Sequence, residues 1–423
     1  MAGDTGAAAR EWREGWPIVF ACTCGMSLLG MGFLTASTYF APLEAAFHWT
    51  RAQTTSAFTV YALPSILFAP AVGVLLDKLG FRRIALVGCV LVGGAWALFA
   101  TLNGSVLYWL LLWLLLAGLS QLIMVTLWSK AISSYFTASR GLALGVTMAG
   151  NGVMQFVAPN IANHLIDSQG WRAAFLITGL GWGAIVTLVC YFLLKEPLDK
   201  EQGQASEAAP SAELTGYSVR DGVRSASFIK IISAVFICYL VTIGLMIHLI
   251  PVLTWGGLTQ DQAVWIYSSV GITGILGNVL GGHLVDRLPA KPFAAILIAL
   301  PAVACLMLLQ PTGSLVQRVI AANIFGICAG GQMPAFGYLS TRYFGLRNFG
   351  TLFGFVTSAM AVPTSIAPVL AGLLFDRSHS YTTVLMLFIP LALLGGLVML
   401  SLGRYPHFDP VARDAAAAEP ATA

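Results

Sequence analysis

Charged side chains are scarce in this chain. Only 9% of its 423 residues are Asp, Glu, Lys or Arg, whereas a soluble domain carries about 25%. This deficit excludes an ordinary soluble protein. Apolar runs of the length that crosses a bilayer, about 20 residues, follow one another from Trp16 to Leu402. They leave no room for a sizeable soluble domain.

The chain also lacks the signatures of several functional classes. It has no Walker motif, which excludes an ATP-driven pump on this chain, and no metal-spaced cluster of His or Cys. Its seven cysteines lie in apolar segments without a pairing pattern. We therefore expect no enzymatic activity, no cofactor, no bound metal and no nucleic-acid partner. The cysteines are Cys22, Cys24, Cys89, Cys190, Cys238, Cys305 and Cys328.

The apolar runs predict an all-α membrane protein of twelve transmembrane helices. The first run is too long for a signal peptide, so we interpret it as the first span. The predicted spans are residues 16–40, 53–76, 82–101, 106–136, 141–165, 171–194, 228–252, 262–286, 291–310, 315–342, 349–374 and 382–402.

Basic residues predict the orientation of these spans. With both termini in the cytoplasm, seventeen Lys and Arg lie inside and four lie outside, and Lys130 within a span completes the 22. The positive-inside rule therefore places both termini in the cytoplasm, and we expect a multi-pass protein of the inner membrane. The outer four are Arg51, Arg172, Arg318 and Arg377.

Polar segments divide the chain into domains. A cytoplasmic tail, 1–15, precedes a six-helix bundle, 16–194. A polar linker, 195–227, cannot bury a core and leads to a second bundle, 228–403. The last segment, 404–423, has the composition of a disordered cytoplasmic tail.

The two bundles are related by an internal repeat. Five identities share an offset of 209, and the strings around them are similar; the pairs are Pro42 and Pro251, Gly73 and Gly282, Asp77 and Asp286, Pro159 and Pro368, and Asp167 and Asp376. Parallel six-helix repeats are typical of transporters with a substrate site near the bilayer midplane, between the halves. A channel needs no such two-state design, so the repeat favours a carrier.

The loop after the second span carries the most specific motif. Gly73-Val-Leu-Leu-Asp77-Lys-Leu-Gly-Phe-Arg82-Arg83 resembles the signature of the major facilitator superfamily, with a degenerate copy at Asp286-Arg287. The resemblance implies the major facilitator fold of two pseudo-symmetric six-helix bundles. The alternative interpretation is positive-inside charge with a glycine turn. The candidate residues of a conformational latch are Gly73, Asp77, Arg82, Arg83, Arg140, Asp286 and Arg287.

Other motifs resemble the monocarboxylate-transporter-like branch and its bacterial members. The run from Tyr135 to Asn151 is similar to that branch's fifth-helix signature, and Glu14-Gly15-Trp16 to a shortened first-helix signature. Members that carry small carboxylates use a lysine in span one and an arginine in span eight. Leu34 and Asn278 stand at those positions here, so the resemblance does not establish a lactate-like substrate.

Ionisable groups within spans are the first candidates for the substrate site, because each costs about 2.5–3.5 kcal/mol to insert. Lys130 is a candidate anion-binding charge, or it extends along its stem to the membrane surface. His248 either titrates near neutral pH or is structural. Arg318 either contacts substrate or anchors its helix. No carboxylate lies at the midplane, so proton coupling would use a histidine, an edge carboxylate or the substrate's charge.

Neutral polar residues complete the candidate site. Some of them line a cavity and others bond between helices. They are Asn151, Gln155, Asn278, Tyr61, Tyr267, Tyr338 and Gln332. The leading hypothesis is a monomeric secondary transporter of a small organic solute, a carboxylate, with protons as the candidate coupling ion and membrane lipids around it. The alternative is an exporter or importer of neutral or amphipathic compounds.

Overall fold

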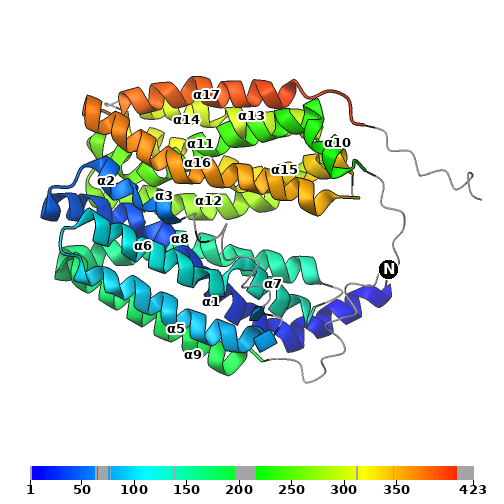
Figure 1. Cartoon of the computed structure of the whole chain (residues 1–423), viewed down its shortest axis with the longest axis horizontal. Helices are drawn as coiled ribbons and strands as arrows, with labels where there is room; N and C mark the ends of the chain where they lie inside the picture. The colour runs from blue at the N-terminus through cyan, green and yellow to red at the C-terminus, as the bar shows by residue number, and fades with distance from the viewer. Residues whose placement is uncertain are drawn as a thin grey trace, which may run out of the picture.

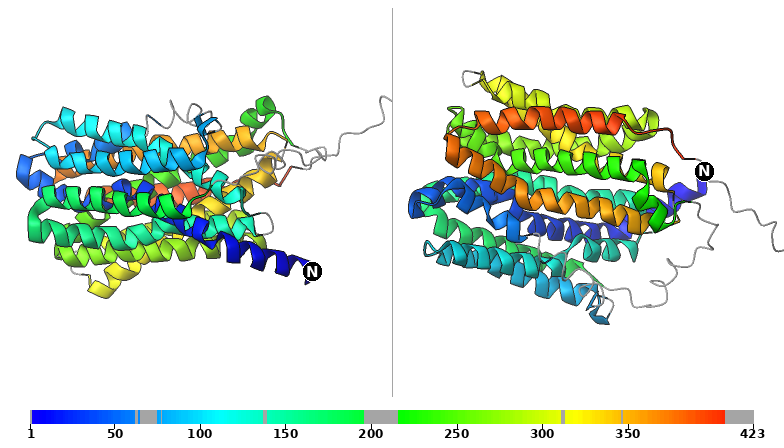
Figure 2. Two further views of the ribbon diagram at one scale, coloured as in Figure 1. Left: turned by 90° about the horizontal axis from the view of Figure 1, so that it is seen from below. Right: turned by 45° about the horizontal axis from the view of Figure 1, so that its top comes forward.

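The computed structural model describes residues 2–61, 64, 75–76, 78–136, 139–195, 216–310, 313–345 and 347–406. This part of the chain is almost entirely helical, and the helices run along the long axis of the molecule (Figures 1 and 2). In hydrocarbon a backbone N–H or C=O group must find its partner within the protein, and a helix provides that partner locally.

The first bundle contains the helices that precede the linker. A π-helical turn, η3, continues α8 into α9, and the 3-10 turns η1 and η2 follow α5 and α6. The elements are α1 (Ala2–Phe47), α2 (Arg51–Thr55), α3 (Ala57–Tyr61), α5 (Phe81–Ala97), η1 (Leu98–Thr101), α6 (Val106–Ser120), η2 (Gln121–Ile123), α7 (Val125–Ser133), α8 (Arg140–Leu176), η3 (Ile177–Trp182) and α9 (Gly183–Leu193).

The second bundle follows a short helix, α10 (Val219–Arg224), which lies within the predicted linker. Pro301 interrupts one predicted span and divides it into α13 and α14, because proline lacks the N–H that continues a helix. The elements are α11 (Ala226–Trp255), α12 (Gln260–Arg287), α13 (Ala290–Ala299), α14 (Pro301–Leu308), α15 (Leu315–Phe344), α16 (Phe349–Ser378) and α17 (Thr382–Leu400).

Ten stretches within the described ranges are long and apolar enough to cross a membrane. One of them, Gly141–Leu193, holds both the fifth and the sixth predicted spans, which Gly170 separates with its φ of 83°. Of the second predicted span, only the start, in α2 and α3, and three later residues are described. The first helix is longer than predicted, since α1 extends through the predicted N-terminal tail.

Each bundle has its own hydrophobic core. The core of the first bundle runs from Ile18 to Leu194 and includes Ile243 and Ile247 from the second bundle. The second bundle is filled by two separate clusters. Figure 1 shows α11 and α13–α17 in the upper half of the view and α1 and α5–α9 in the lower half. The chain therefore folds as two packed units.

Local geometry repeats at the same offset of 209 as the sequence. Thr50 caps α2 in a capping box with Gln53, and Thr259 caps α12 in a capping box with Gln262. Left-handed backbone recurs at His48 (φ 56°) and Gly257 (φ 91°), and again at Gly170 (φ 83°) and His379 (φ 51°). The repeat therefore holds at the level of individual turns and caps.

The bundles meet through the half of the molecule that contains α2. Gly152 of α8 and Gly271 of α12 pack backbone to backbone, since a Cβ on Gly271 would lie 2.6 Å from the Gly152 carbonyl oxygen. Towards the other end of these helices, a Cβ on Gly145 or Gly282 would meet no atom of a described residue within 4 Å. We call the tightly packed end of the interface the closed end, and the end at Gly145 and Gly282, where the described residues make no such close contact, the separated end.

Glycines also set the packing of α12 on α15, and they allow a test of the fold. A Cβ on Gly330 would lie 2.0 Å from the Gly274 carbonyl oxygen, whereas one on Gly337, two turns further along α15, would meet no described atom within 4 Å.

We expect Gly330→Leu to lower the melting temperature in detergent by several degrees, because overpacking costs about 1–3 kcal/mol or more. Gly337→Leu is the matched control, and an equal effect of both variants would contradict this packing.

Candidate functional site

Three helices from both bundles, α1, α8 and α12, meet at one junction. The Tyr267 hydroxyl of α12 donates a hydrogen bond to the Leu34 carbonyl of α1 at 2.9 Å. Asn151 of α8 packs against Gly30 of α1, where a Cβ would lie 2.5 Å from the Asn151 Oδ1 atom. This junction, which we call the central junction, brings together Leu34, Tyr267 and Asn151.

The central junction contains buried polar atoms without partners. Among the described residues, Asn151 Oδ1 and Gln155 Nε2 are buried and make no hydrogen bond. Gln155 lies one turn beyond Asn151 on α8, and its Cβ lies against Gly271. Because leaving such an atom unpaired costs about 1–3 kcal/mol, these two atoms are the junction's candidates for hydrogen bonding to a solute.

Lys130 lies on α7 and not among the residues of the central junction. Its side chain is exposed, as is that of Thr126 one turn earlier, and Ser129 and Ser133 are half-buried. The exposed positions of α6, the preceding part of the same predicted span, are leucines: Leu107, Leu111, Leu114 and Leu115. The surface of this span thus changes from apolar to polar between α6 and α7, with Val125 as an exposed apolar residue at the boundary.

The remaining substrate candidates are divided between bundles. Gln332 is buried and its amide donates to the Thr242 hydroxyl at 3.2 Å, within the second bundle. Tyr61 packs edge-on against Trp113, at 5.7 Å between ring centroids, in the first bundle. Tyr338 is half-buried on α15, and Asn278 is exposed on α12. These four residues do not join the central junction.

The predicted latch is only partly visible. Gly73 and Asp77 lie outside the described residues, and the side chains of Arg140 and Asp286 are not described. Arg82 donates to the Tyr191 carbonyl at 2.9 Å. Arg83 and Arg287 are exposed at the separated end of the interface. The latch therefore stays a prediction.

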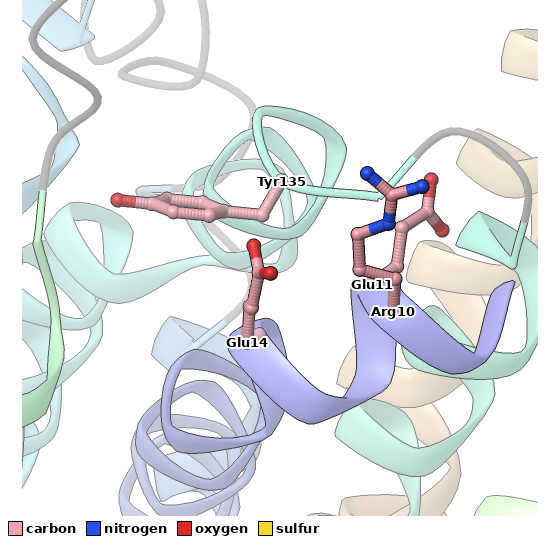
Figure 3. A pocket seen from close by; sticks show the side chains of 5 residues that line it. Arg10, Glu11, Glu14 and Tyr135 are labelled. Carbon is pink, nitrogen blue, oxygen red and sulfur yellow. The ribbon is translucent and has the colours of Figure 1, made fainter. Parts of the chain in front are cut away.

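Two motifs of the sequence meet at the N-terminal end of α1. A pocket of about 260 Å³ is lined by Arg10, Glu11, Glu14 and Gly15 of α1 and by Tyr135 after α7 (Figure 3). Glu11 Oε2 accepts hydrogen bonds from the Ser139 backbone N–H at 3.0 Å and its hydroxyl at 2.9 Å. The first-helix and fifth-helix motifs thus form one contact within the first bundle.

The closed end contains functional candidates that the sequence did not single out. Asp376, at the end of α16, accepts hydrogen bonds from the backbone N–H groups of Arg51 at 3.0 Å and Ala52 at 2.9 Å. A carboxylate of one bundle thereby caps the helix α2 of the other, where the helix dipole favours negative charge. The sequence carried one signal that could have identified Asp376, because Asp376 is the partner of Asp167 in the internal repeat.

A chain of side chains extends from this cap into the second bundle. Arg51 Nε lies 2.6 Å from a Glu44 carboxylate oxygen, and Arg51 Nη1 donates to the Tyr381 hydroxyl at 3.1 Å. His248 Nε2 donates to the Pro368 carbonyl at 2.8 Å, and Nδ1 shares a hydrogen bond of 2.9 Å with the Tyr381 hydroxyl. Both ring nitrogens of His248 thus have partners within the second bundle, which supports the structural interpretation.

Arg318 also makes a structural contact. It is buried near the start of α15, and its guanidinium donates to the carbonyl of Gly256, at the end of α11. A cation at a helix C-terminus is stabilised by the helix dipole. This contact supports the anchoring interpretation of Arg318.

Comparison with known proteins decides the family. The model of the Major Facilitator Superfamily matches residues 21–316 and 234–422. The chain belongs to this superfamily. Its all-α fold of two pseudo-symmetric six-helix bundles is the predicted one, and it is a multi-pass membrane transport protein, not an enzyme.

Relatives within the superfamily carry the monocarboxylate transporter name. The chain is 26% identical over 409 residues to monocarboxylate transporter 12 of Homo sapiens, covering 88% of this chain and 77% of the relative. It is 24% identical over 400 residues to monocarboxylate transporter 13 of Rattus norvegicus, covering 93% and 89%. The predicted resemblance to the monocarboxylate-transporter-like branch is confirmed.

A solved structure shows the same fold. The bacterial homologue of the human lysosomal transporter Spinster, in an inward-facing and unoccupied conformation, is 18% identical and matches with a TM-score of 0.68. The match covers 90% of this chain and 92% of that one.

The cap on α2 allows a test of the closed end of this superfamily member. We expect Asp376→Asn to open that end, because the side chain loses its charge and one of its two acceptor atoms. This loss is worth about 1–2 kcal/mol, or a roughly 5–30-fold shift in the equilibrium between the closed and the open state of that end. The reporter is Thr55→Cys, since Thr55 is buried against Gly372, and its labelling rate by a membrane-impermeant maleimide is measured. Asp167→Asn is the matched control, as Asp167 is the repeat partner. An unchanged rate in Asp376→Asn would disprove the role of the cap.

Proposed function

We propose that this superfamily member is a secondary active transporter that moves a small organic carboxylate across the inner membrane by alternating access. Its relatives' names and its two-bundle fold support transport of small solutes. The observation that carries the choice of an anion is the polar face of α7 with Lys130 at its centre.

The polar face of α7 is best explained by contact with water. A lipid-facing surface is apolar, as the exposed leucines of α6 are, and an ionisable residue within a span almost always faces the bundle interior or an aqueous cavity. Thr126, Ser129, Lys130 and Ser133 share one face at helical spacing. We place this face on the aqueous path of the substrate, with Lys130 as the positive partner of the carboxylate. Snorkelling of Lys130 to the membrane surface is the competing explanation.

Neutral groups would complete the binding of the carboxylate. The unpaired Gln155 Nε2 is a donor for a carboxylate oxygen, and Asn151 Oδ1 is an acceptor for a hydroxyl group of the solute. Leu34 and Asn278 replace the cations of related carriers, which leaves Lys130 as the basic residue that we assign to the substrate path.

The proposed orientation makes the conformation inward-open. The N-terminus, α10 and the end of α17 lie at the end opposite to α2 in Figure 1, and the sequence places these segments in the cytoplasm. The contact of Gly152 with Gly271 would then close the outer side. Alternation requires the cap on α2 and the contact of α8 with α12 to separate while the inner ends approach.

Protons are the coupling ion that we propose. Asp376 and Glu44 are edge carboxylates that hold the closed end, and we assign coupling to this pair. The proposal also includes the domain organisation and the oligomeric state. The two bundles lie within 16–194 and 228–403, the linker is 195–227, and the protein is a monomer.

The alternative function is transport of neutral or amphipathic compounds. Loss of both family cations, at Leu34 and Asn278, is the specific observation that favours it. A site built only on Asn151 and Gln155 would recognise hydrogen-bonding groups without requiring charge.

Transport measurements separate these functions. In proteoliposomes, we expect saturable uptake of labelled small carboxylates that rises with an inward proton gradient. Lys130→Met, which keeps the length and removes the charge, should lower uptake at least about tenfold, because a charge-assisted hydrogen bond is worth about 1.5–3 kcal/mol.

The controls are chosen by charge and position. Lys130→Arg should retain substantial uptake, and Arg224→Ala, which removes an exposed cation on α10, should change nothing. Carboxylate uptake that Lys130→Met leaves intact, or uptake confined to neutral aromatics, would reject the Lys130 site and favour the alternative.

Topology is tested separately by cysteine labelling. Asn103→Cys, in the exposed loop before α6, should react with an impermeant maleimide in intact cells, and Arg224→Cys only after permeabilisation. The reverse pattern would overturn the orientation while leaving the fold unaffected.

A further inference from the structure

A second cavity lies on the membrane-facing side of the first bundle. It is a crevice of about 560 Å³ between α1, α8 and the segment formed by η3 and α9. Exposed apolar side chains surround its opening, including Phe20 of α1, Val157 of α8 and Ile185 of α9. These residues lie on transmembrane helices, so the crevice opens towards the lipid.

The dimensions of this membrane-facing crevice suit one hydrocarbon chain. Its lining on α1 extends from Phe20 to Tyr39, about 28 Å at the helical rise of 1.5 Å per residue. That is close to the thickness of the hydrocarbon core, about 30 Å. A cylinder of this length and volume is about 5 Å wide, the width of a single chain whose carbons contact their neighbours at about 4 Å.

The lining has almost no hydrogen-bonding capacity left. The hydroxyls of Thr23, Ser27, Thr35 and Thr178 each donate to a backbone carbonyl three or four residues earlier on their own helix, at 2.6–2.7 Å. In the part of the chain that is described, no Asp, Glu, Lys, Arg or His lines the crevice. The walls therefore favour hydrocarbon and disfavour a charged solute.

One hydroxyl is not bonded to the backbone, and it lies at one end of the crevice. The Tyr39 hydroxyl is buried and makes no hydrogen bond of normal geometry with a described residue, and the Thr178 hydroxyl is its polar neighbour. The Tyr39 ring stacks on that of Phe175, with 3.9 Å between the ring centroids. Tyr39 lies about 12 Å along α1 from Met31, in the middle of the lining, at 1.5 Å per residue. With Met31 near the midplane, this depth is close to the edge of the hydrocarbon core, where the ester groups of lipids begin.

We infer that the crevice is a binding site for one acyl chain of a phospholipid, which lies parallel to α1 with its ester oxygen accepting a hydrogen bond from Tyr39. The chain fills the space between α1, α8 and α9 and satisfies the Tyr39 hydroxyl. The π-helical turn η3 forms part of the wall, and such turns frequently occur at functional sites. This site is distinct from the solute path on α7.

Gly181 of η3 provides a way to fill the crevice. It lines the cavity, and a Cβ there would meet no described atom within 4 Å. Gly94 of α5 is the matched control, because a Cβ there is equally unobstructed and its neighbours along the helix, Leu91 and Leu98, are exposed. The two phenylalanine variants place the same ring inside and outside the crevice.

The test uses purified full-length protein in vesicles that contain a phosphatidylcholine with a diazirine on one acyl chain. After irradiation, mass spectrometry should find the lipid on crevice residues such as Met31 and Met154 in the wild type. Gly181→Phe should reduce this labelling at least about fivefold, because a ring and a chain cannot occupy the same volume, and Gly94→Phe should leave it unchanged.

A second variant keeps the test valid if Gly181→Phe fails to fold. Tyr39→Phe retains the ring and removes only the hydroxyl, so the mole fraction of probe lipid that gives half-maximal labelling should rise about threefold to tenfold. Equal labelling in the wild type and in a folded Gly181→Phe would overturn the site, as would an unchanged half-maximal fraction in Tyr39→Phe. Labelling of the crevice by a neutral amphipathic photoprobe without labelling by the phospholipid would overturn the choice of ligand.

Discussion

The close approach of two glycine-bearing helices, α8 and α12, holds the two bundles in this arrangement. Gly152 and Gly271 allow the two backbones to touch, and Tyr267 and Asn151 are positioned beside that contact. In hydrocarbon no hydrophobic force draws helices together, so small residues that permit close packing determine where they associate. The central junction and its unpaired polar atoms follow from this contact.

Polar interactions add a second point of attachment at the same end. Asp376 caps α2, and Arg51 joins Glu44, Tyr381 and His248 into one network. Arg51, Glu44 and Asp376 are half-buried, so water competes with these bonds less than it would on an open surface. The attachment at this end therefore depends on a small number of bonds between named side chains.

The polar face of α7 and the membrane-facing crevice illustrate how one bundle presents two different surfaces. The face of α7 carries hydroxyls and a lysine, while the crevice beside α1 has committed nearly all of its hydroxyls to the backbone. Ser133 of α7 also donates to a backbone carbonyl of its own helix, that of Ser129, at 2.6 Å. The two surfaces therefore differ in the lysine and in the apolar lining of the crevice, and not in how their hydroxyls are bonded.

The sequence by itself determined the class of fold, because scarcity of charge, apolar length and a 209-residue repeat are local or additive properties. It also identified the family through contiguous motifs. Only the tertiary structure decided which end is closed, that Asp376 caps a helix of the other bundle, and that Asn151 and Gln155 lack partners while His248 and Gln332 have them. These facts depend on contacts between residues 90 or more positions apart. Their geometry arises from tertiary packing and cannot be derived from either segment alone.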